Sequence, residues 1–353
     1  MKTFRHILTL IFLTLTLFAC DDTSFSDPHL MPVKMSGVRI HNLSFVKPLP
    51  DGTVAYPVVE NGGVRIAKIS RDGTVTYSEL VDEFDPNGFA VNASGECLVS
   101  GKKVVKYDRL GKIAFIGDNT DYTSMLLDNG DICYSQNYEY EGYRLEIHTV
   151  GNNFVYVING EECWNDALPF DDKWFAFNYN NLFCIFDADG NVVCNGELDG
   201  SVASLKYING YLYIIVNGGF VDLDAETVDY ITKWSVVKMT TDGRIIYNVS
   251  VENTDIYNIT VHDGKLFVAG DVITDITKDG TYGMIYVLDD TNGGVLSAIP
   301  TEYKGCQIVP LYISPDFNGE YDVYAARRDN YESDYPQLVL YHTDDLSRLN
   351  IEN

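Results

Sequence analysis

The sequence predicts an all-β fold built from one repeated unit, and three observations support this. The chain of 353 residues is rich in aromatic residues, with 25 Tyr and 17 Phe, and strands favour aromatic and β-branched residues. Short apolar runs alternate with Asp-Gly and Asn-Gly pairs, which are typical of tight turns between antiparallel strands. No helical periodicity extends past the N-terminal segment.

The turn pairs recur at a regular spacing. One series lies between apolar strands at Asp51-Gly52, Ser94-Gly95, Asn129-Gly130, Asp171-Asp172, Asn209-Gly210, Asp263-Gly264 and Asn318-Gly319. Its six steps average about 44 residues. A second series interleaves with it at Asp72-Gly73, Leu110-Gly111, Gly151-Asn152, Asp189-Gly190, Asp242-Gly243, Asn292-Gly293 and Asp344-Asp345. Each unit therefore holds four strands, with turns after the first and third.

Four antiparallel strands in about 40 to 45 residues form the blade of a β-propeller. The third strand ends in a hydrophobic-Asp-x-x-Gly turn at Tyr107 to Gly111 and at Phe186 to Gly190, with looser copies at Ile69 to Gly73 and Met239 to Gly243. Residues 38 to 353 resemble the broad superfamily of bacterial β-propellers, whose third strand ends in this motif. The resemblance implies a fold and no activity, because the signature pairs of the WD40 family and the docking motifs of quinone-dependent dehydrogenases are missing.

We expect seven four-stranded blades, and six or eight also fit the spacing. The last three units are longer than the others, and the segment from Ser36 to Asn42 offers a strand that could pair with the last blade. A pair of β-sandwich domains is the alternative architecture. It accounts for the strands and turns but not for the two interleaved series.

The N-terminus has the pattern of a secretory signal. Lys2 and Arg5 precede an apolar run from Ile7 to Phe18. As a helix, this run of about 12 residues would cover about 18 Å, well short of the ~30 Å hydrocarbon core. We therefore expect an export signal and not a membrane span.

Leu17-Phe18-Ala19-Cys20 closes this segment and resembles the lipobox of bacterial lipoproteins. The resemblance implies that residues 1–19 are a cleaved signal peptide and that Cys20 carries palmitate, which holds the protein to the lipid bilayer. Residues 20–32 predict a flexible tether, and residues 33–353 the propeller domain. The acidic pair after Cys20 resembles the export signal of surface lipoproteins in Bacteroides-like bacteria. This favours the outer membrane and cell surface of a Gram-negative bacterium, although in enterobacteria an Asp there is associated with inner-membrane retention.

The chain is strongly acidic, with 25 basic and 51 acidic residues. Residues 1–19 contain Lys2 and Arg5 and no acid, so the remainder carries 23 basic and 51 acidic residues, a formal net charge of −28. Nucleic acid is excluded as a partner, because phosphate binding requires a basic surface. The charge also repels anionic lipid, so the membrane contact is assigned to the lipid on Cys20.

Catalytic signatures are absent: the chain has no G-x-S-x-G, H-E-x-x-H, P-loop or G-x-G-x-x-G motif. Its histidines are isolated and its cysteines lack C-x-x-C spacing. We therefore predict no catalytic residue, no cofactor and no metal site.

The connection between the second and third strands is short in blades two and four and long in blades three, five, six and seven. The long connections span residues 136–143, 217–233, 271–282 and 327–337. In a four-stranded blade they open on the face opposite both series of tight turns. They are rich in Tyr and acid, and the predicted ligand-binding residues are Tyr138, Tyr140, Tyr143, Phe220, Asp222, Tyr230, Tyr282, Tyr331 and Tyr335.

Exposed rings beside carboxylates suit stacking on a sugar or contact with the basic and apolar groups of a protein partner. The alternative is that these rings only pack beneath their own loops. We therefore expect a non-catalytic surface binding or scaffold lipoprotein that presents an acidic, aromatic face to a glycan or an envelope protein. The other candidate is a carbohydrate-active enzyme, a lyase or glycoside hydrolase, with paired carboxylates in the central funnel.

One disulfide is suggested by local geometry. Phe186 to Asn191 is consistent with a three-residue hairpin loop that places Asp187 opposite Asn191. Continuing that register places Cys184 opposite Cys194, close enough for a cross-strand disulfide. The alternative is two buried cysteines that pack as small hydrophobic residues.

Overall fold

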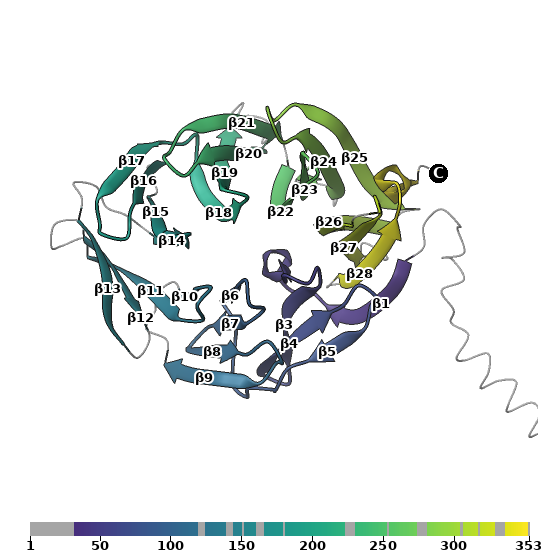
Figure 1. The fold of residues 1–353 in the computed structure, drawn as a ribbon. Coiled ribbons are helices and arrows are strands. Elements are labelled where there is room, and N and C mark those ends of the chain that lie inside the picture. The colour runs from purple at the N-terminus through teal and green to yellow at the C-terminus, as the bar shows by residue number, and fades with distance from the viewer. Residues whose placement is uncertain are drawn as a thin grey trace, which may run out of the picture.

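The computed structural model describes residues 32–118, 124–138, 144–149, 152–159, 166–178, 181–222, 230–252, 254–273, 281–303, 306–316, 318–328 and 336–351. Within these ranges the chain forms a β-propeller, with antiparallel sheets set around a central opening (Figure 1). The predicted all-β fold is confirmed. The described part contains no helix that is long and apolar enough to cross a membrane.

Five of the sheets hold four strands each, which follow chain order from the centre of the ring outward (Figure 1). The first three consist of β2 (Lys47–Pro48), β3 (Val54–Glu60), β4 (Gly63–Ile69) and β5 (Val75–Tyr77); β6 (Gly88–Val91), β7 (Cys97–Ser100), β8 (Lys103–Tyr107) and β9 (Ile113–Asp118); and β10 (Ser124–Leu126), β11 (Ile132–Tyr138), β12 (Arg144–Thr149) and β13 (Asn152–Asn159). The next two consist of β14 (Asp166–Phe170), β15 (Lys173–Phe177), β16 (Leu182–Phe186) and β17 (Val192–Glu197); and β18 (Ser201–Ile208), β19 (Tyr211–Asp222), β20 (Tyr230–Thr240) and β21 (Ile245–Glu252).

The sixth sheet has nine strands, and we call it the double blade. Its strands are β22 (Thr254–His262), β23 (Lys265–Ile273), β24 (Thr281–Asp289), β25 (Val295–Tyr303), β26 (Cys306–Pro315), β27 (Tyr321–Arg328), β28 (Gln337–Thr343), β1 (Pro32–Arg39) and the short parallel β29 (Asn350–Ile351). Two 3-10 helices, η2 (Leu43–Phe45) and η4 (Leu346–Leu349), complete the described elements.

Counted by hydrogen bonding, the propeller has six blades, so the expectation of seven separate blades is wrong. In the double blade, two four-stranded groups, β22–β25 and β26–β28 with β1, are joined because β25 pairs with β26. The joining pairs are Glu302 with Gln307 and Tyr303 with Cys306. This pairing lies in the connection between the groups, away from the tight turns, so the spacing of the turns could not reveal it.

The N-terminal strand closes the ring. β1 runs antiparallel to β28, with Met35 opposite Val339, and so becomes the outer strand of the double blade. On the neighbouring sheet, Arg71 Nε lies 2.7 Å from Asp322 Oδ2 of β27. His342 Nδ1 lies 2.8 Å from the other oxygen of Asp322, and this carboxylate raises the pKa of His342.

Neighbouring four-stranded groups pack face to face through apolar clusters. Between β14–β17 and β18–β21, for example, the buried Phe175, Phe183 and Ile214 share one cluster. The rings of Phe175 and Phe183 stack with centroids 5.3 Å apart. Because each sheet has a neighbour on both sides, its middle strands, such as β15 and β16, are buried on both faces, which explains the near-continuous apolar runs of the sequence.

A lysine also links successive groups at three equivalent places. Lys68, Lys106 and Lys238 each stand on a third strand, two residues before its turn. Lys68 Nζ donates to Arg109 O at 2.9 Å, Lys106 Nζ to Gly130 O at 2.5 Å, and Lys238 Nζ to Asp290 O at 2.7 Å. Each ammonium thus bonds to a turn carbonyl of the next group, and we call these contacts the lysine links.

Lys238 is the most enclosed of the three. Its ammonium lies 2.8 Å from Asp290 Oδ2 and 4.5 Å from the centroid of the Tyr211 ring. The Tyr213 hydroxyl donates to Asp290 Oδ1 at 2.8 Å, so both charges of this buried pair have additional partners. Removing one partner of such a pair strongly lowers stability, because the other charge is left without its counter-charge.

Cys97, Cys133, Cys184 and Cys194 are free thiols, so the predicted bond between Cys184 and Cys194 is wrong. A β-bulge between Ile185 and Phe186 shifts the register by one residue, so that Cys184 faces Asn195 and Ile185 faces Cys194. A shift of one residue turns a side chain to the other face of the sheet. Cys184 is buried beside the preceding sheet, and Cys194 Sγ packs against Gly243 of the next.

We expect Lys238→Ala to lower the free energy of unfolding by about 3–5 kcal/mol, because it leaves Asp290 as an unpaired buried charge. Lys112→Ala is the matched control. Lys112 Nζ lies 3.6 Å from Glu79 and both side chains are exposed, so its loss should cost less than about 1 kcal/mol. Urea denaturation at pH 7.5 measures both, and equal losses would contradict a stabilising role for the lysine link.

Candidate functional site

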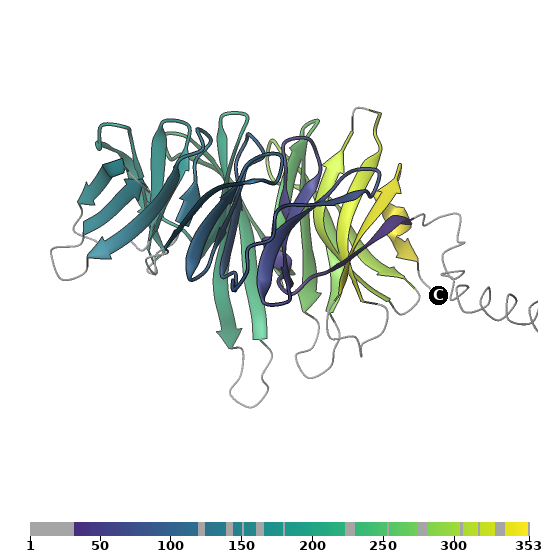
Figure 2. The same ribbon diagram turned by 90° about the horizontal axis from the view of Figure 1, so that it is seen from below.

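The two faces of the propeller differ. The tight turns lie on one face, and the connections between second and third strands lie on the other, which we call the loop face. There β19 and β20 stay paired as far as Asp222 and Tyr230, so their hairpin projects from the disc (Figure 2). The segment 217–233, expected as a loop, is therefore largely strand, because residues 219–222 and 230–233 are mainly aromatic and β-branched.

The described members of the predicted binding set lie at the loop-face ends of their strands. Tyr138 ends β11, Phe220 and Asp222 lie at the end of β19, and Tyr230 begins β20. Tyr282 lies near the start of β24 and is half-buried. The remaining members, Tyr140, Tyr143, Tyr331 and Tyr335, lie outside the described residues.

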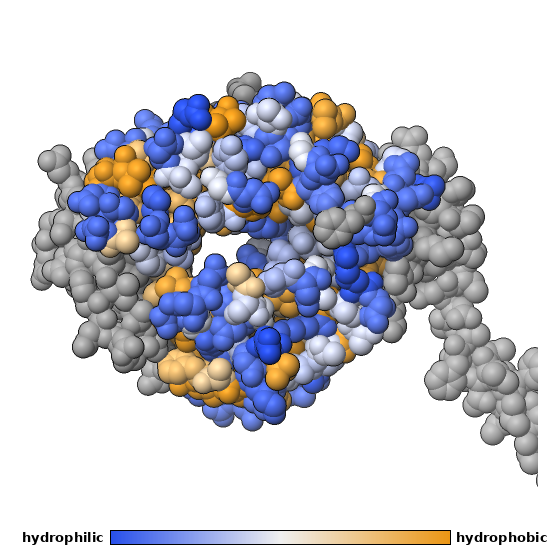
Figure 3. All heavy atoms as spheres, in the orientation of Figure 1, coloured by the Kyte–Doolittle hydropathy of each residue, from blue (hydrophilic) through white to orange (hydrophobic). Residues whose placement is uncertain are grey.

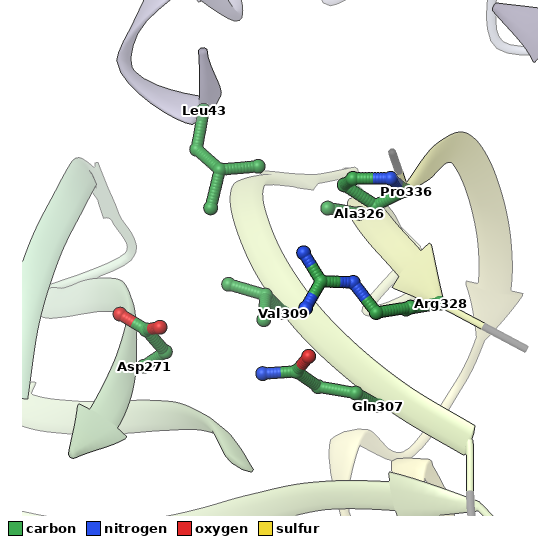
Figure 4. A pocket seen from close by; sticks show the side chains of 7 residues that line it. All are labelled: Leu43, Asp271, Gln307, Val309, Ala326, Arg328 and Pro336. Carbon is green, nitrogen blue, oxygen red and sulfur yellow. The ribbon is translucent and has the colours of Figure 1, made fainter. Parts of the chain in front are cut away.

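A cavity of about 110 Å³ opens between the two groups of the double blade, and none of the predicted residues lines it (Figure 4). Asp271 stands near the end of β23, Gln307 near the start of β26 and Arg328 at the end of β27. These positions put the cavity on the loop face. The full lining is Leu43, Asp271, Gln307, Val309, Ala326, Arg328 and Pro336.

Asp271 is in an unfavourable electrostatic position. It is 7% exposed, and Asp255 stands directly opposite on β22, where like charges destabilise a strand pair. Burial raises the pKa of Asp271 to about 6; a hydrogen bond from the Tyr257 hydroxyl lowers it and the charge of Asp255 raises it. Burial also raises the pKa of Asp255, and the neighbouring Trp234 opposes that shift.

Two of the side chains that line the cavity carry an unsatisfied polar atom. Oδ1 of Asp271 and Nε of Arg328 are buried and have no hydrogen-bond partner. Asp271 stands on one wall, and the Arg328 guanidinium extends from the opposite wall towards the middle (Figure 4). Each unmade bond costs about 1–3 kcal/mol. A polar ligand could recover that cost, so the arrangement is suited to binding.

The space-filling view shows an opening at the centre of the ring (Figure 3). A second polar cluster lies on the innermost strands β18 and β22. Lys206 of β18 donates through Nζ to Asn258 Oδ1 and, at 2.9 Å, to Ile259 O. Burial and the charge of Lys47 lower the pKa of Lys206 to about 7. The carboxylates of Asp255 and Asp271, which face each other in register, lie instead in the double blade, where Asp271 lines the cavity.

Asp271 and Arg328 were not predicted, although the sequence carries a faint signal for both. Asp271 directly follows the apolar run Val268-Ala269-Gly270, and Arg327-Arg328 is a basic pair in an acidic chain. Both fall within the predicted long connections. A charge that immediately follows a buried strand is the feature that could have singled them out.

No protein-family model and no curated protein matches the sequence. Among solved structures, the WD40 β-propeller domain of Doa1 is similar over 89% of this chain and 98% of that chain, with 14% identity and a TM-score of 0.53. BamB from Moraxella catarrhalis matches over 89% and 99%, with 12% identity and a TM-score of 0.48. The computationally designed Ika8 protein matches over 89% and 97%, with 10% identity and a TM-score of 0.49. The likeness to the Doa1 domain shows the β-propeller fold alone.

We expect Asp271→Asn to raise the free energy of unfolding of the unliganded protein by about 1–3 kcal/mol at pH 7.5. The pKa of Asp271 is raised from 3.8 to about 6 in the folded state. As the pH rises, the folded protein therefore keeps the Asp271 proton up to a higher pH than the unfolded chain does. The contribution of Asp271 to stability therefore falls as pH rises from about 4 to 6.

Denaturation at pH 4 and pH 7.5 checks this prediction, since the advantage of the variant should be small at the lower pH. Asp82→Asn removes an exposed carboxylate and is the matched control. A variant less stable than wild type at pH 7.5 would contradict the assignment of Asp271 as a strained charge.

Proposed function

We propose that the protein is a lipid-anchored binding scaffold of the bacterial envelope that contacts a protein partner through its loop face. In this proposal residues 1–19 are the signal peptide, residues 20–32 the tether and residues 33–353 the propeller domain. Palmitate on Cys20 holds the mature chain to the outer membrane, and the propeller faces the cell exterior. The spacing of the apolar run before Cys20 supports the anchor.

The observation that carries the binding role is the difference between the two faces. The described part of one face consists of tight turns, whereas the paired strands β19 and β20 project from the other (Figure 2). Loops on a rigid scaffold commonly carry function. The projecting strands give the partner an extended surface at the rim of that face.

Charge favours a protein with a basic surface as the partner. The chain outside residues 1–19 carries a formal net charge of −28, from 23 basic and 51 acidic residues, which speeds encounter with a basic partner and offers a neutral glycan nothing comparable. Stacking on sugars requires exposed rings, and Tyr282 is half-buried. A glycan is therefore the less favoured ligand of this face.

The carboxylate pair Asp255 and Asp271 is the one observation that favours a glycoside hydrolase or lyase. The cavity beside the pair measures about 110 Å³, however, and sites for drug-sized ligands usually measure about 300–1,000 Å³. A polysaccharide segment needs more room than this. The geometry thus favours binding over glycan cleavage.

The anchor is tested by Cys20→Ser. The variant should be recovered in the soluble fraction and should incorporate no labelled palmitate, because it lacks the acylated sulfur. Ser24→Ala, four residues further on, is the control and should stay in the membrane fraction. Retention of Cys20→Ser in the membrane with normal palmitate labelling would exclude this anchor.

The binding face is tested by placing a photo-crosslinking phenylalanine analogue at Tyr138 and Tyr230 on the loop face. The controls are the exposed Asn129 and Asn318 on the tight-turn face. After irradiation of cells, we expect one adduct with a basic protein from the loop-face positions only. Adducts from the tight-turn positions alone, or none from the loop face, would show that the faces are wrongly assigned.

A further inference from the structure

The cavity on the double blade holds opposite charges that do not meet. Asp271 and Arg328 stand on opposite walls, with Gln307 and Val309 between them (Figure 4). Among the described residues, no ion pair joins the two side chains. A carboxylate and a guanidinium in contact would satisfy each other through strong paired hydrogen bonds. Here Asp271 Oδ1 and Arg328 Nε both remain without a partner.

We propose that this cavity binds a small zwitterion, a free α-amino acid, whose ammonium bonds to Asp271 and whose carboxylate bonds to Arg328. This site is additional to the partner contact proposed for the rim of the loop face. The carboxylate oxygen carries the argument, because Asp271 is 7% exposed and its side chain lines the cavity. A buried charged atom without a partner is expensive unless a ligand supplies one.

A ligand with a single charge satisfies only half of the cavity. An amine alone would pair with Asp271 but leave Arg328 Nε without an acceptor. An acid alone would pair with Arg328 but leave Asp271 unpaired and opposed by Asp255. Sugar hydroxyls could bond to both walls, but they would compensate neither charge. The α-amino acid has one group for each wall.

The size of the cavity agrees with this ligand. A volume of about 110 Å³ corresponds to about four water molecules at ~30 Å³ each. Glycine and alanine have five and six non-hydrogen atoms, so each fits such a space. Leu43, Ala326 and Pro336 supply apolar lining and favour a short aliphatic side chain over a charged one.

Groups beside Asp271 make this end of the cavity favourable for an ammonium. The carboxylate of Asp255 adds negative potential from the adjacent strand, and the Tyr257 hydroxyl favours the charged form of Asp271 by lowering its pKa. The guanidinium of Arg328 is the cation that faces this pair across the cavity (Figure 4). An incoming ammonium compensates the repulsion between the two carboxylates.

Calorimetric titration of the purified protein with l-alanine, ethylamine and propionate tests the proposal. Ethylamine is alanine without its carboxylate, and propionate is alanine without its amine, so each probe tests one of the two charges. We expect l-alanine to bind and each single-charge probe to bind at least about 10-fold more weakly, since a hydrogen bond to a charged group contributes about 1.5–3 kcal/mol. l-Glutamate should bind more weakly than l-alanine.

Asp271→Asn and Arg328→Gln should each weaken alanine binding at least about 10-fold. Asp82→Asn and Arg109→Gln remove exposed charges elsewhere and should leave it unchanged, and the melting temperature shows that each variant is folded. Absence of alanine binding, equal binding of ethylamine or propionate, or unchanged affinity in a folded Asp271→Asn or Arg328→Gln variant would overturn the proposal.

Discussion

The face-to-face packing of neighbouring sheets is the interaction on which the ring depends. Each four-stranded group buries apolar side chains on both faces, so no group can fold without its neighbours. The lysine links reinforce this packing by placing an ammonium on a turn carbonyl of the next group, at Lys68, Lys106 and Lys238. The cluster that contains Val38, Tyr56 and Leu340 joins the beginning of the chain to its end. The disc held in this way is the rigid support for the strand ends that form the loop face.

Features set by local chemistry could be predicted from the sequence. The four-strand repeat follows from turn residues whose side chains bond to their own backbone: Asp108 accepts from Leu110 N at 2.9 Å, and Asp187 from Asp189 N at 3.0 Å. Features set by backbone register could not be predicted. The joining of β25 to β26 and the bulge that turns Cys194 away from Cys184 depend on backbone register, and turn residues do not encode that register.

The candidate site likewise has one part that could be predicted from the sequence and one that could not. Its face could be predicted, because the length of a connection is a local property and the alternation of strands decides where it emerges. The cavity could not, since Asp255 and Asp271 meet Arg328 only after two groups of the double blade have packed. The tyrosines of the predicted binding set remain predictions, because their role depends on a partner and on side-chain positions beyond the described residues. The carboxylates of Asp255 and Asp271 stand directly opposite each other, and this like-charge pair lowers stability at one place on the loop face. Such unfavourable contacts are common at binding sites.

Closure of the ring by β1 and β28 has a consequence for the order of folding. Met35 and Val339 are separated by roughly 300 residues, so the last hydrogen-bonded ladder forms only after almost the whole chain has been synthesised. Contacts of such long range slow folding. Until β1 docks, the outer edge of β28 is a free template on which the β1 strand of a second molecule can pair equally well. Strand-exchanged dimers are therefore the misfolded species to which this architecture is most exposed, and they become more frequent as chain concentration rises.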